Sequence, residues 1–111
     1  MIYIVRFAPE ALNQLNELER YIAADGAPVV AARYVDAIVD YCASLETNPH
    51  RGTRRDDIRT GLRTIGYRRR VTIAFEIVDD TVAVNILGIY YGGQDYEASL
   101  RDGDQEPPSL D

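Results

Sequence analysis

Two apolar stripes at helical spacing, each preceded by a proline, constrain the fold of this chain more than any other feature. The first predicts an amphipathic helix that begins at Pro9 and carries Ala11, Leu15, Leu18 and Ile22 on one side. The second predicts a helix that begins at Pro28 and ends before Asn48-Pro49, with the stripe Ala31, Val35, Ile38, Cys42 and Leu45. Only Asp25-Gly26-Ala27 separates the two, so we expect an antiparallel helix hairpin whose joint apolar side needs a cover.

Predicted strands supply that cover. Residues 2–7 are rich in β-branched and aromatic side chains and predict a first strand. A loop is expected over 48–58, and it is followed by strands over 61–65, 70–77 and 81–90, the last two joined by a tight turn at Asp79-Asp80. The predicted fold is α+β: an N-terminal strand, then an antiparallel helix hairpin packed on a small antiparallel sheet, in the order β-α-α-β-β-β.

The length of 111 residues suits one domain, because two cores would each be too small to fold alone. Apolar content falls after Asp95, so we expect a single domain over 1–96 and an acidic, disordered tail over 97–111. The longest apolar runs are far shorter than the roughly 20 residues of a membrane span, and the start does not resemble a signal peptide. We therefore expect a cytoplasmic protein without a membrane partner.

The sequence offers few groups for catalysis. With Cys42 and His50 as the only cysteine and histidine, it has no internal disulfide, four-ligand zinc site or evident nucleophile-base pair. Gly92-Gly93 follows the last predicted strand without a helix pattern that could bind phosphate. We therefore predict no cofactor, no metal site and no catalytic residue.

Positive charge is concentrated in one segment of an acidic chain. The formal net charge is −6, yet residues 50–70 carry eight arginines against two aspartates, and the chain contains no lysine. The candidate partner-binding residues in this segment are Arg59, Arg63, Arg68, Arg69 and Arg70. A pI near 4.7 disfavours direct sequence-specific binding to nucleic acid and favours an acidic peptide as the complement. The alternative is a solvated loop and sheet rim.

The exit of the last predicted strand is a second unusual segment. It carries Tyr90 and Tyr91, followed by Asp95 and Tyr96. Tyrosine is frequent at interface hot spots, so we add Tyr90, Tyr91 and Asp95 to the candidate partner-binding residues. Packing in the core and at its rim is the alternative.

An ordered set of motifs spans residues 2 to about 96. It comprises Phe7-x-Pro9-x-Ala11-x-x-x-Leu15, Tyr21-Ile22-Ala23, Ala31-x-x-Tyr34-Val35, Leu45-x-x-x-Pro49-x-x-Gly52, Gly61-Leu62-Arg63, Val71-x-Ile73-x-Phe75 and Ile86-x-x-Ile89-x-x-Gly92-Gly93-Gln94-Asp95. This set resembles the RelE/ParE superfamily of type II toxins, and the Gly-Leu-Arg and Gly-Gln-Asp elements resemble its ParE branch, the toxins of plasmid stabilisation systems.

The resemblance implies a toxin of a toxin-antitoxin operon. A ParD-like antitoxin would wrap around it and form a hetero-oligomer, and the implied target is DNA gyrase, inhibited by binding and without catalysis by the toxin. The RelE branch instead cleaves ribosome-bound mRNA with lysine, arginine and tyrosine side chains. Here Thr72 and Gly93 or Gln94 fall about where that branch places basic residues. A ribosome-dependent mRNA endonuclease and a degenerate, non-toxic antitoxin-binding protein are the alternatives.

Overall fold

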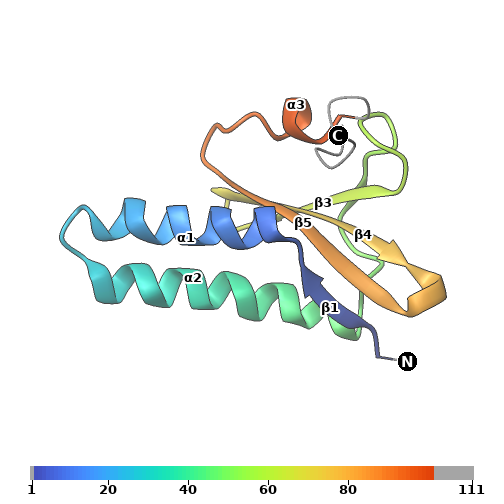
Figure 1. The fold of residues 1–111 in the computed structure, drawn as a ribbon, viewed down its shortest axis with the longest axis horizontal. Coiled ribbons are helices and arrows are strands. Elements are labelled where there is room, and N and C mark those ends of the chain that lie inside the picture. Colours follow the sequence, from blue (N-terminus) through green and yellow to red (C-terminus); the bar gives the residue numbers. More distant parts are fainter. Residues whose placement is uncertain (1, 102–111) are drawn as a thin grey trace, which may run out of the picture.

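Two long helices and a five-stranded sheet make up most of the computed structural model, which describes residues 2–101 (Figure 1). The elements are β1 (Ile4–Phe7), α1 (Pro9–Ala23), α2 (Pro28–Ala43), a 3-10 turn (Ser44–Glu46), β2 (Thr53–Arg54), β3 (Leu62–Tyr67), β4 (Val71–Val78), a 3-10 turn (Asp79–Thr81), β5 (Ala83–Tyr91) and α3 (Tyr96–Leu100). The helix hairpin covers one face of the sheet, and α3 lies on the other side (Figure 1). No helix within residues 2–101 is both long and apolar enough to cross a membrane.

The predicted helix hairpin is confirmed, and its stripes form the main core. Pro9 and Pro28 open the helices, where the absence of a proline N–H costs no hydrogen bond. The buried stripe residues are Ala11, Leu15 and Leu18 of α1, Ala31, Val35, Ile38 and Cys42 of α2, and Leu45 of the following 3-10 turn, whereas Ile22 is partly buried near the end of α1. These side chains pack against Val71, Ile73, Phe75, Val84, Ile86 and Ile89 of the sheet.

The sheet is mixed, with the strand order β1-β5-β4-β3-β2. Strands β3 to β5 pair antiparallel as predicted, and β2 pairs antiparallel with β3, but β1 pairs parallel with β5. A parallel neighbour requires a long crossover, and the helix hairpin begins that connection. The predicted loop over 48–58 contains one element that the sequence did not indicate, the two-residue strand β2, which is too short for a period-two pattern.

A β-bulge in β5 changes which side chains face the helices. Phe75 of β4 pairs with Ile86 and Ala74 pairs with Gly88, so Leu87 is the extra residue. Before the bulge the even-numbered Val84 and Ile86 face the helices, and after it Ile89 and Tyr91 do. Tyr90 consequently points to the opposite face of the sheet.

That opposite face has a small core of its own. Leu100 of α3 packs there against four other buried residues, Ile58, Leu62, Ala74 and Tyr90. Residues 97–100 of the expected tail lie in α3, where Leu100 fills an apolar site and is only 3% exposed. The rest of the predicted tail, 102–111, lies outside the described residues.

Candidate functional site

The arginine-rich segment does not form one continuous basic surface. Arg51 donates hydrogen bonds to the Tyr41 hydroxyl (3.1 Å) and to the Ser44 hydroxyl (3.0 Å). Arg63 donates to the main-chain carbonyl of Arg51 (3.2 Å), and Arg54 forms an ion pair with Asp56 (3.2 Å). Arg51 and Arg63 thus connect the loop between α2 and β3 to α2 and to β3, whereas the ion pair of Arg54 lies within the loop.

Three consecutive arginines remain exposed at the tip of the β3–β4 hairpin. Arg68, Arg69 and Arg70 connect Tyr67 to Val71, the last pair of the hairpin ladder. Within residues 2–101 none of the three forms an ion pair. The Arg68 guanidinium lies 5.2 Å from the centre of the Tyr67 ring, a cation–π contact. The hairpin tip therefore presents positive charge that no ion pair within residues 2–101 neutralises.

The backbone of this turn is strained. Arg68 and Arg69 have φ angles of 52° and 68°, in the left-handed region that glycine or asparagine usually occupies in such turns. The left-handed conformation costs a non-glycine residue about 1 to 2 kcal/mol. Such strain is found where the side chains themselves are needed, which is consistent with a binding role for this tip.

A row of tyrosines connects the hairpin tip to the helices. The centre of the Tyr91 ring is 6.0 Å from that of Tyr21 on α1 and 6.3 Å from that of Tyr34 on α2. Burial raises the pKa of the Tyr34 hydroxyl, and the neighbouring Tyr91 raises it further. Both effects favour the protonated form of this hydroxyl, which can donate a hydrogen bond.

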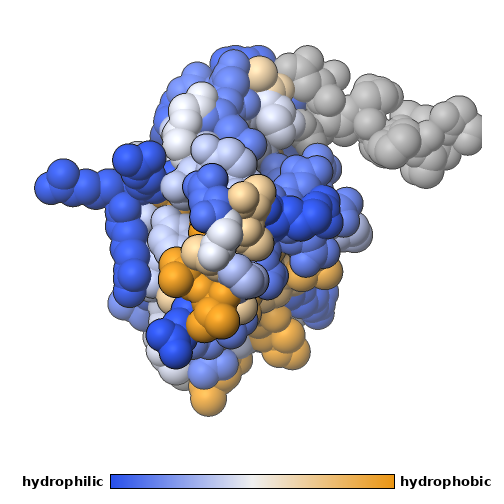
Figure 2. Space-filling view, turned by 90° about the vertical axis from the view of Figure 1, so that its left-hand side faces the viewer, coloured by the Kyte–Doolittle hydropathy of each residue, from blue (hydrophilic) through white to orange (hydrophobic). Residues whose placement is uncertain are grey.

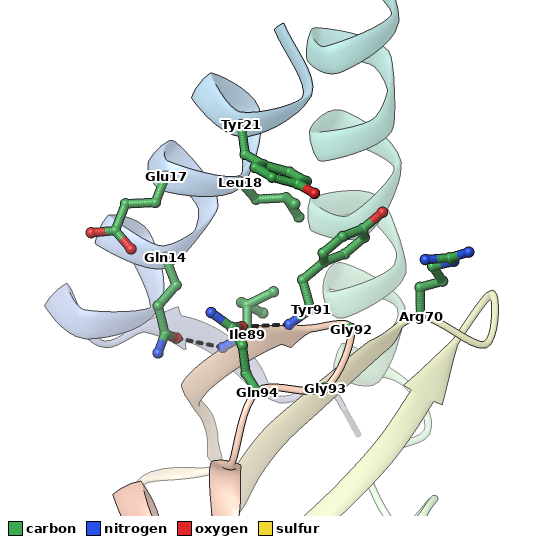
Figure 3. A pocket seen from close by; sticks show the side chains of 10 residues that line it. All are labelled: Gln14, Glu17, Leu18, Tyr21, Arg70, Ile89, Tyr91, Gly92, Gly93 and Gln94. Carbon is green, nitrogen blue, oxygen red and sulfur yellow. Dashed lines mark hydrogen bonds between the residues drawn. The ribbon is translucent and has the colours of Figure 1, made fainter. Parts of the chain in front are cut away.

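A pocket of about 450 Å³ lies between α1 and the exit of β5 (Figure 3). Its lining residues are Gln14, Glu17, Leu18, Tyr21, Arg70, Ile89, Tyr91, Gly92, Gly93 and Gln94. The side-chain oxygen of Gln14 accepts a hydrogen bond from the Ile89 N–H, and that of Gln94 accepts one from the Tyr91 N–H, both at 2.6 Å. We call this site the β5-edge pocket. It combines an apolar wall, a strand edge and the Arg70 side chain.

The predicted site residues are divided between the two sides of the sheet. Arg68, Arg69, Arg70 and Tyr91 gather around the β5-edge pocket and the hairpin tip. By contrast, Tyr90 is buried on the other face, where its hydroxyl lies 3.0 Å from that of Ser99. The remaining three residues also lie elsewhere: Arg59 lines a second pocket with Tyr90 and Leu100, Arg63 holds the Arg51 carbonyl, and Asp95 caps α3 by accepting from the Ala98 N–H (3.2 Å).

Three residues that line the pocket were not selected in the sequence analysis: Gln14, Tyr21 and Gln94. Gln14 occupies an ordinary helical position next to the apolar stripe, and Gln94 follows two glycines. Gln14 accepts a hydrogen bond from Ile89, which is 75 residues away in the sequence. Nothing in the local sequence pattern distinguishes such a glutamine from one whose side chain is exposed to solvent.

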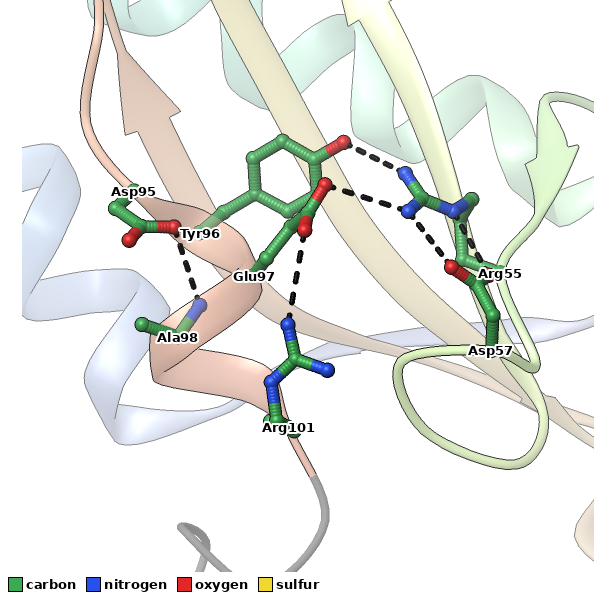
Figure 4. Close-up of polar contacts among 7 residues, drawn as sticks. All are labelled: Arg55, Asp57, Asp95, Tyr96, Glu97, Ala98 and Arg101. Atoms are coloured by element: carbon green, nitrogen blue, oxygen red, sulfur yellow. Dashed lines mark hydrogen bonds and ion pairs between the residues drawn. The ribbon is translucent and has the colours of Figure 1, made fainter.

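Helix α3 is attached to the domain by a polar network centred on Arg55 (Figure 4). The Arg55 guanidinium donates to the Tyr96 hydroxyl (3.0 Å) and forms ion pairs with Glu97 (3.3 Å) and Asp57 (2.9 Å). Its hydrogen bonds to Asp57 are the main reason why the pKa of that carboxyl is lowered. The contacts of Asp57, Glu97 and Tyr96 in this network are thus all made with the planar, forked guanidinium of Arg55.

We expect Arg55→Lys to loosen α3 without unfolding the domain. Lysine keeps the charge but cannot reach three acceptors in the geometry of a planar fork. Hydrogen exchange of the amides in residues 96–100 should accelerate severalfold, while exchange in α1 and α2 stays unchanged. Arg54→Lys is the matched control, because the ion pair of Arg54 with Asp56 does not involve α3. Equal exchange in both variants would contradict this role of Arg55.

The same network predicts a defined acid limit. The pKa of Asp57 is lower in the folded protein than the ordinary aspartate pKa of about 3.9. The ionised Asp57 carboxylate therefore stabilises the folded protein fully above that ordinary pKa. This stabilisation is lost as the pH falls through the lower pKa of the folded state. The contribution of the Arg55–Asp57 pair to stability should therefore be fully present at neutral pH and be lost only below about pH 3.9.

Comparison with known proteins identifies relatives of this fold. Residues 5–96 match the family model described as the ParE toxin of the type II toxin-antitoxin system, parDE. No curated protein sequence matches the chain. Among solved structures, a chromosomal ParDE toxin-antitoxin system from P. aeruginosa matches with a TM-score of 0.70 and 20% identity, covering 82% of this chain and 97% of that one.

Two RelE-type structures also match. The RelBE2 toxin-antitoxin complex from Mycobacterium tuberculosis has a TM-score of 0.60 and 22% identity, covering 82% of this chain and 99% of that one. A mutant of the E. coli toxin RelE in the free state has a TM-score of 0.68 and 13% identity, covering 95% and 99%. At these identities, the structural matches establish a shared fold.

Proposed function

The chain belongs to the ParE toxin family of type II toxin-antitoxin systems, and we propose that it inhibits DNA gyrase by binding and is neutralised by a ParD-like antitoxin. The proposal has two parts, a neutralising partner and a target. Different observations support each of them. We also place the protein in the cytoplasm, where gyrase acts.

Charge and exposed apolar surface support an acidic, partly apolar antitoxin segment as the partner. Figure 2 faces the end of the molecule that carries the tip of the helix hairpin, and it shows apolar areas among the polar surface. Val29 and Val30 in the first turn of α2 are 62% and 57% exposed, and Tyr21 at the end of α1 is 65% exposed. A segment that covers this apolar surface and continues to Arg70 would bury aromatic anchors and pair the exposed cations.

The chemistry around the hairpin tip supports inhibition by binding. Cleavage of RNA needs a proton acceptor for the 2′-hydroxyl beside the cations that stabilise the phosphorane. The single observation that carries our proposal is that the last strand and its exit, residues 86–95, contain no basic residue that could stabilise a phosphorane. With no cation on this strand, the exposed arginines of the hairpin tip are better suited to binding a partner than to catalysis.

Two assays with purified, antitoxin-free protein test the target. We expect it to slow DNA supercoiling by gyrase or to trap gyrase on cleaved DNA, and to leave mRNA in a translating ribosome extract intact. Adding the antitoxin encoded beside this chain should restore supercoiling. The matched control is the protein mixed with its antitoxin before gyrase is added.

The opposite results identify the alternatives. Cuts in mRNA at codon positions, with supercoiling unaffected, would contradict gyrase inhibition and indicate a RelE-like endonuclease. No effect in either assay, together with tight antitoxin binding, would indicate a degenerate form that only binds its antitoxin.

A further inference from the structure

Strand β5 has an open edge beside the β5-edge pocket. Strand β1 pairs with β5 only from Ala83 to Ile86, and its last main-chain contact is the hydrogen bond from the Ala8 N–H to the Ile86 carbonyl (2.9 Å). The chain then turns into α1, whereas β5 continues to Tyr91 and still pairs with β4 on its other side. Among the described residues, 2–101, no strand lies beside Ile89 and Tyr91 on this edge of the sheet.

Two glutamine side chains take the place of that missing strand. Ile89 and Tyr91 are two residues apart, so their N–H groups point to the same edge and lie about 7 Å from each other. Each donates to a side-chain amide oxygen, Ile89 to Gln14 and Tyr91 to Gln94, at 2.6 Å (Figure 3). The glutamine oxygens stand where the carbonyls of alternate residues in an added strand would stand.

We propose that the β5-edge pocket is a strand-addition site for an extended segment of the antitoxin. Two main-chain carbonyls of that segment, from alternate residues, replace the oxygens of Gln14 and Gln94 on the N–H groups of Ile89 and Tyr91. The added strand occupies the row of the sheet that β1 leaves. This inference rests on the proposed function, since it specifies how the antitoxin engages the toxin.

The walls of the pocket specify the side chains of the added segment. Leu18, Tyr21 and Tyr91 offer contacts to an aliphatic or aromatic residue. Arg70 and Glu17 lie on opposite sides of the pocket (Figure 3). Arg70 would attract an acidic residue of the antitoxin segment and Glu17 would repel it, so we expect this residue on the side of Arg70. The segment that fits is a short β-strand with an apolar residue facing the helices and a carboxylate at the end near Arg70.

Gly93 provides a test that leaves the fold intact. It lines the pocket, its φ is not in the left-handed region, and a Cβ built on it meets no atom within 4 Å. Gly93→Leu therefore fills the space that the added strand needs. Gly66→Leu is the matched control, because Gly66 also lacks a positive φ and does not line the pocket. A Cβ atom at Gly66 would have the Val71 carbonyl oxygen as its nearest neighbour, at 3.9 Å, so the substitution fits there as well.

The probe is the proposed ParD-like antitoxin at full length, titrated against the full-length toxin variants. We expect Gly93→Leu to weaken binding at least about tenfold and Gly66→Leu to change it less than about twofold. In the complex, the amides of Ile89 and Tyr91 should exchange with solvent more slowly than in the free toxin. Unchanged affinity of Gly93→Leu, or unchanged exchange at both amides, would overturn strand addition while leaving the antitoxin assignment standing. If the wild-type toxin does not bind this antitoxin, the proposed partner fails as well.

Discussion

Replacing Arg68, Arg69 and Arg70 together by glutamate should lower the affinity for the antitoxin by at least about a hundredfold and abolish most of its salt dependence. These three side chains are exposed and are not neutralised by ion pairs within residues 2–101, so a partner can use their full charge. Steering by charge acts mainly on the association rate and weakens as salt is added. Stopped-flow association rates and dissociation constants at two salt concentrations measure both effects.

The matched control reverses three other exposed arginines. Replacing Arg6, Arg20 and Arg33 by glutamate changes the net charge by the same amount, but these residues lie on β1, α1 and α2 and do not line the β5-edge pocket. This variant should bind with nearly the affinity of the wild type. An equal loss in both variants would mean that net charge alone drives association, and that the hairpin tip has no special part in it.

Ending the chain at Gln94 should destabilise the domain by roughly 3 to 5 kcal/mol and lower its melting temperature by about 10 °C or more. This truncation removes α3 and with it Leu100, which is 3% exposed, and it uncovers Tyr90 and Leu62 on the second face of the sheet. It also removes Tyr96 and Glu97, which Arg55 holds. Urea unfolding monitored by circular dichroism measures the loss.

Ending the chain at Arg101 should change the stability by less than about 0.5 kcal/mol. Residues 102–111 contribute Leu110 as their single large apolar side chain, so they can bury little apolar surface. We therefore propose that the toxin domain extends through α3 and that the acidic tail begins after it. A large loss in this longer truncation would show that the tail docks on the domain, and no loss in the shorter one would show that α3 is dispensable.

The local patterns were sufficient for the helices and most strands. Apolar spacings of three and four residues place one side of a helix on the core, and a proline at the first turn costs no hydrogen bond, so the hairpin with its buried Ala11 and Ile38 followed from the sequence alone. The family resemblance followed in the same way, because the motifs keep their order along the chain. The matching family model over residues 5–96 confirms it.

The composition of the candidate site depended on contacts between distant residues. Nearness in sequence suggested one basic surface, yet Arg63 turns to the Arg51 carbonyl, the exposed Arg54 pairs with Asp56, and Arg68 to Arg70 stand together at a hairpin tip. Tyr90 and Tyr91 are adjacent in the chain, but neighbouring side chains of a strand point to opposite faces. One of them packs under α3 and the other faces the helices.

The sequence by itself thus determined the fold class, the core stripes of the helices and the family, since each is encoded in short-range periodicity or in ordered motifs. The tertiary structure alone decided the parallel pairing of β1, the bulge at Leu87 that selects the face of each tyrosine, and the meeting of Gln14 with Ile89. The physical reason is that strand register and hydrogen bonds between distant residues are set by how the layers pack, and packing leaves no period in the sequence.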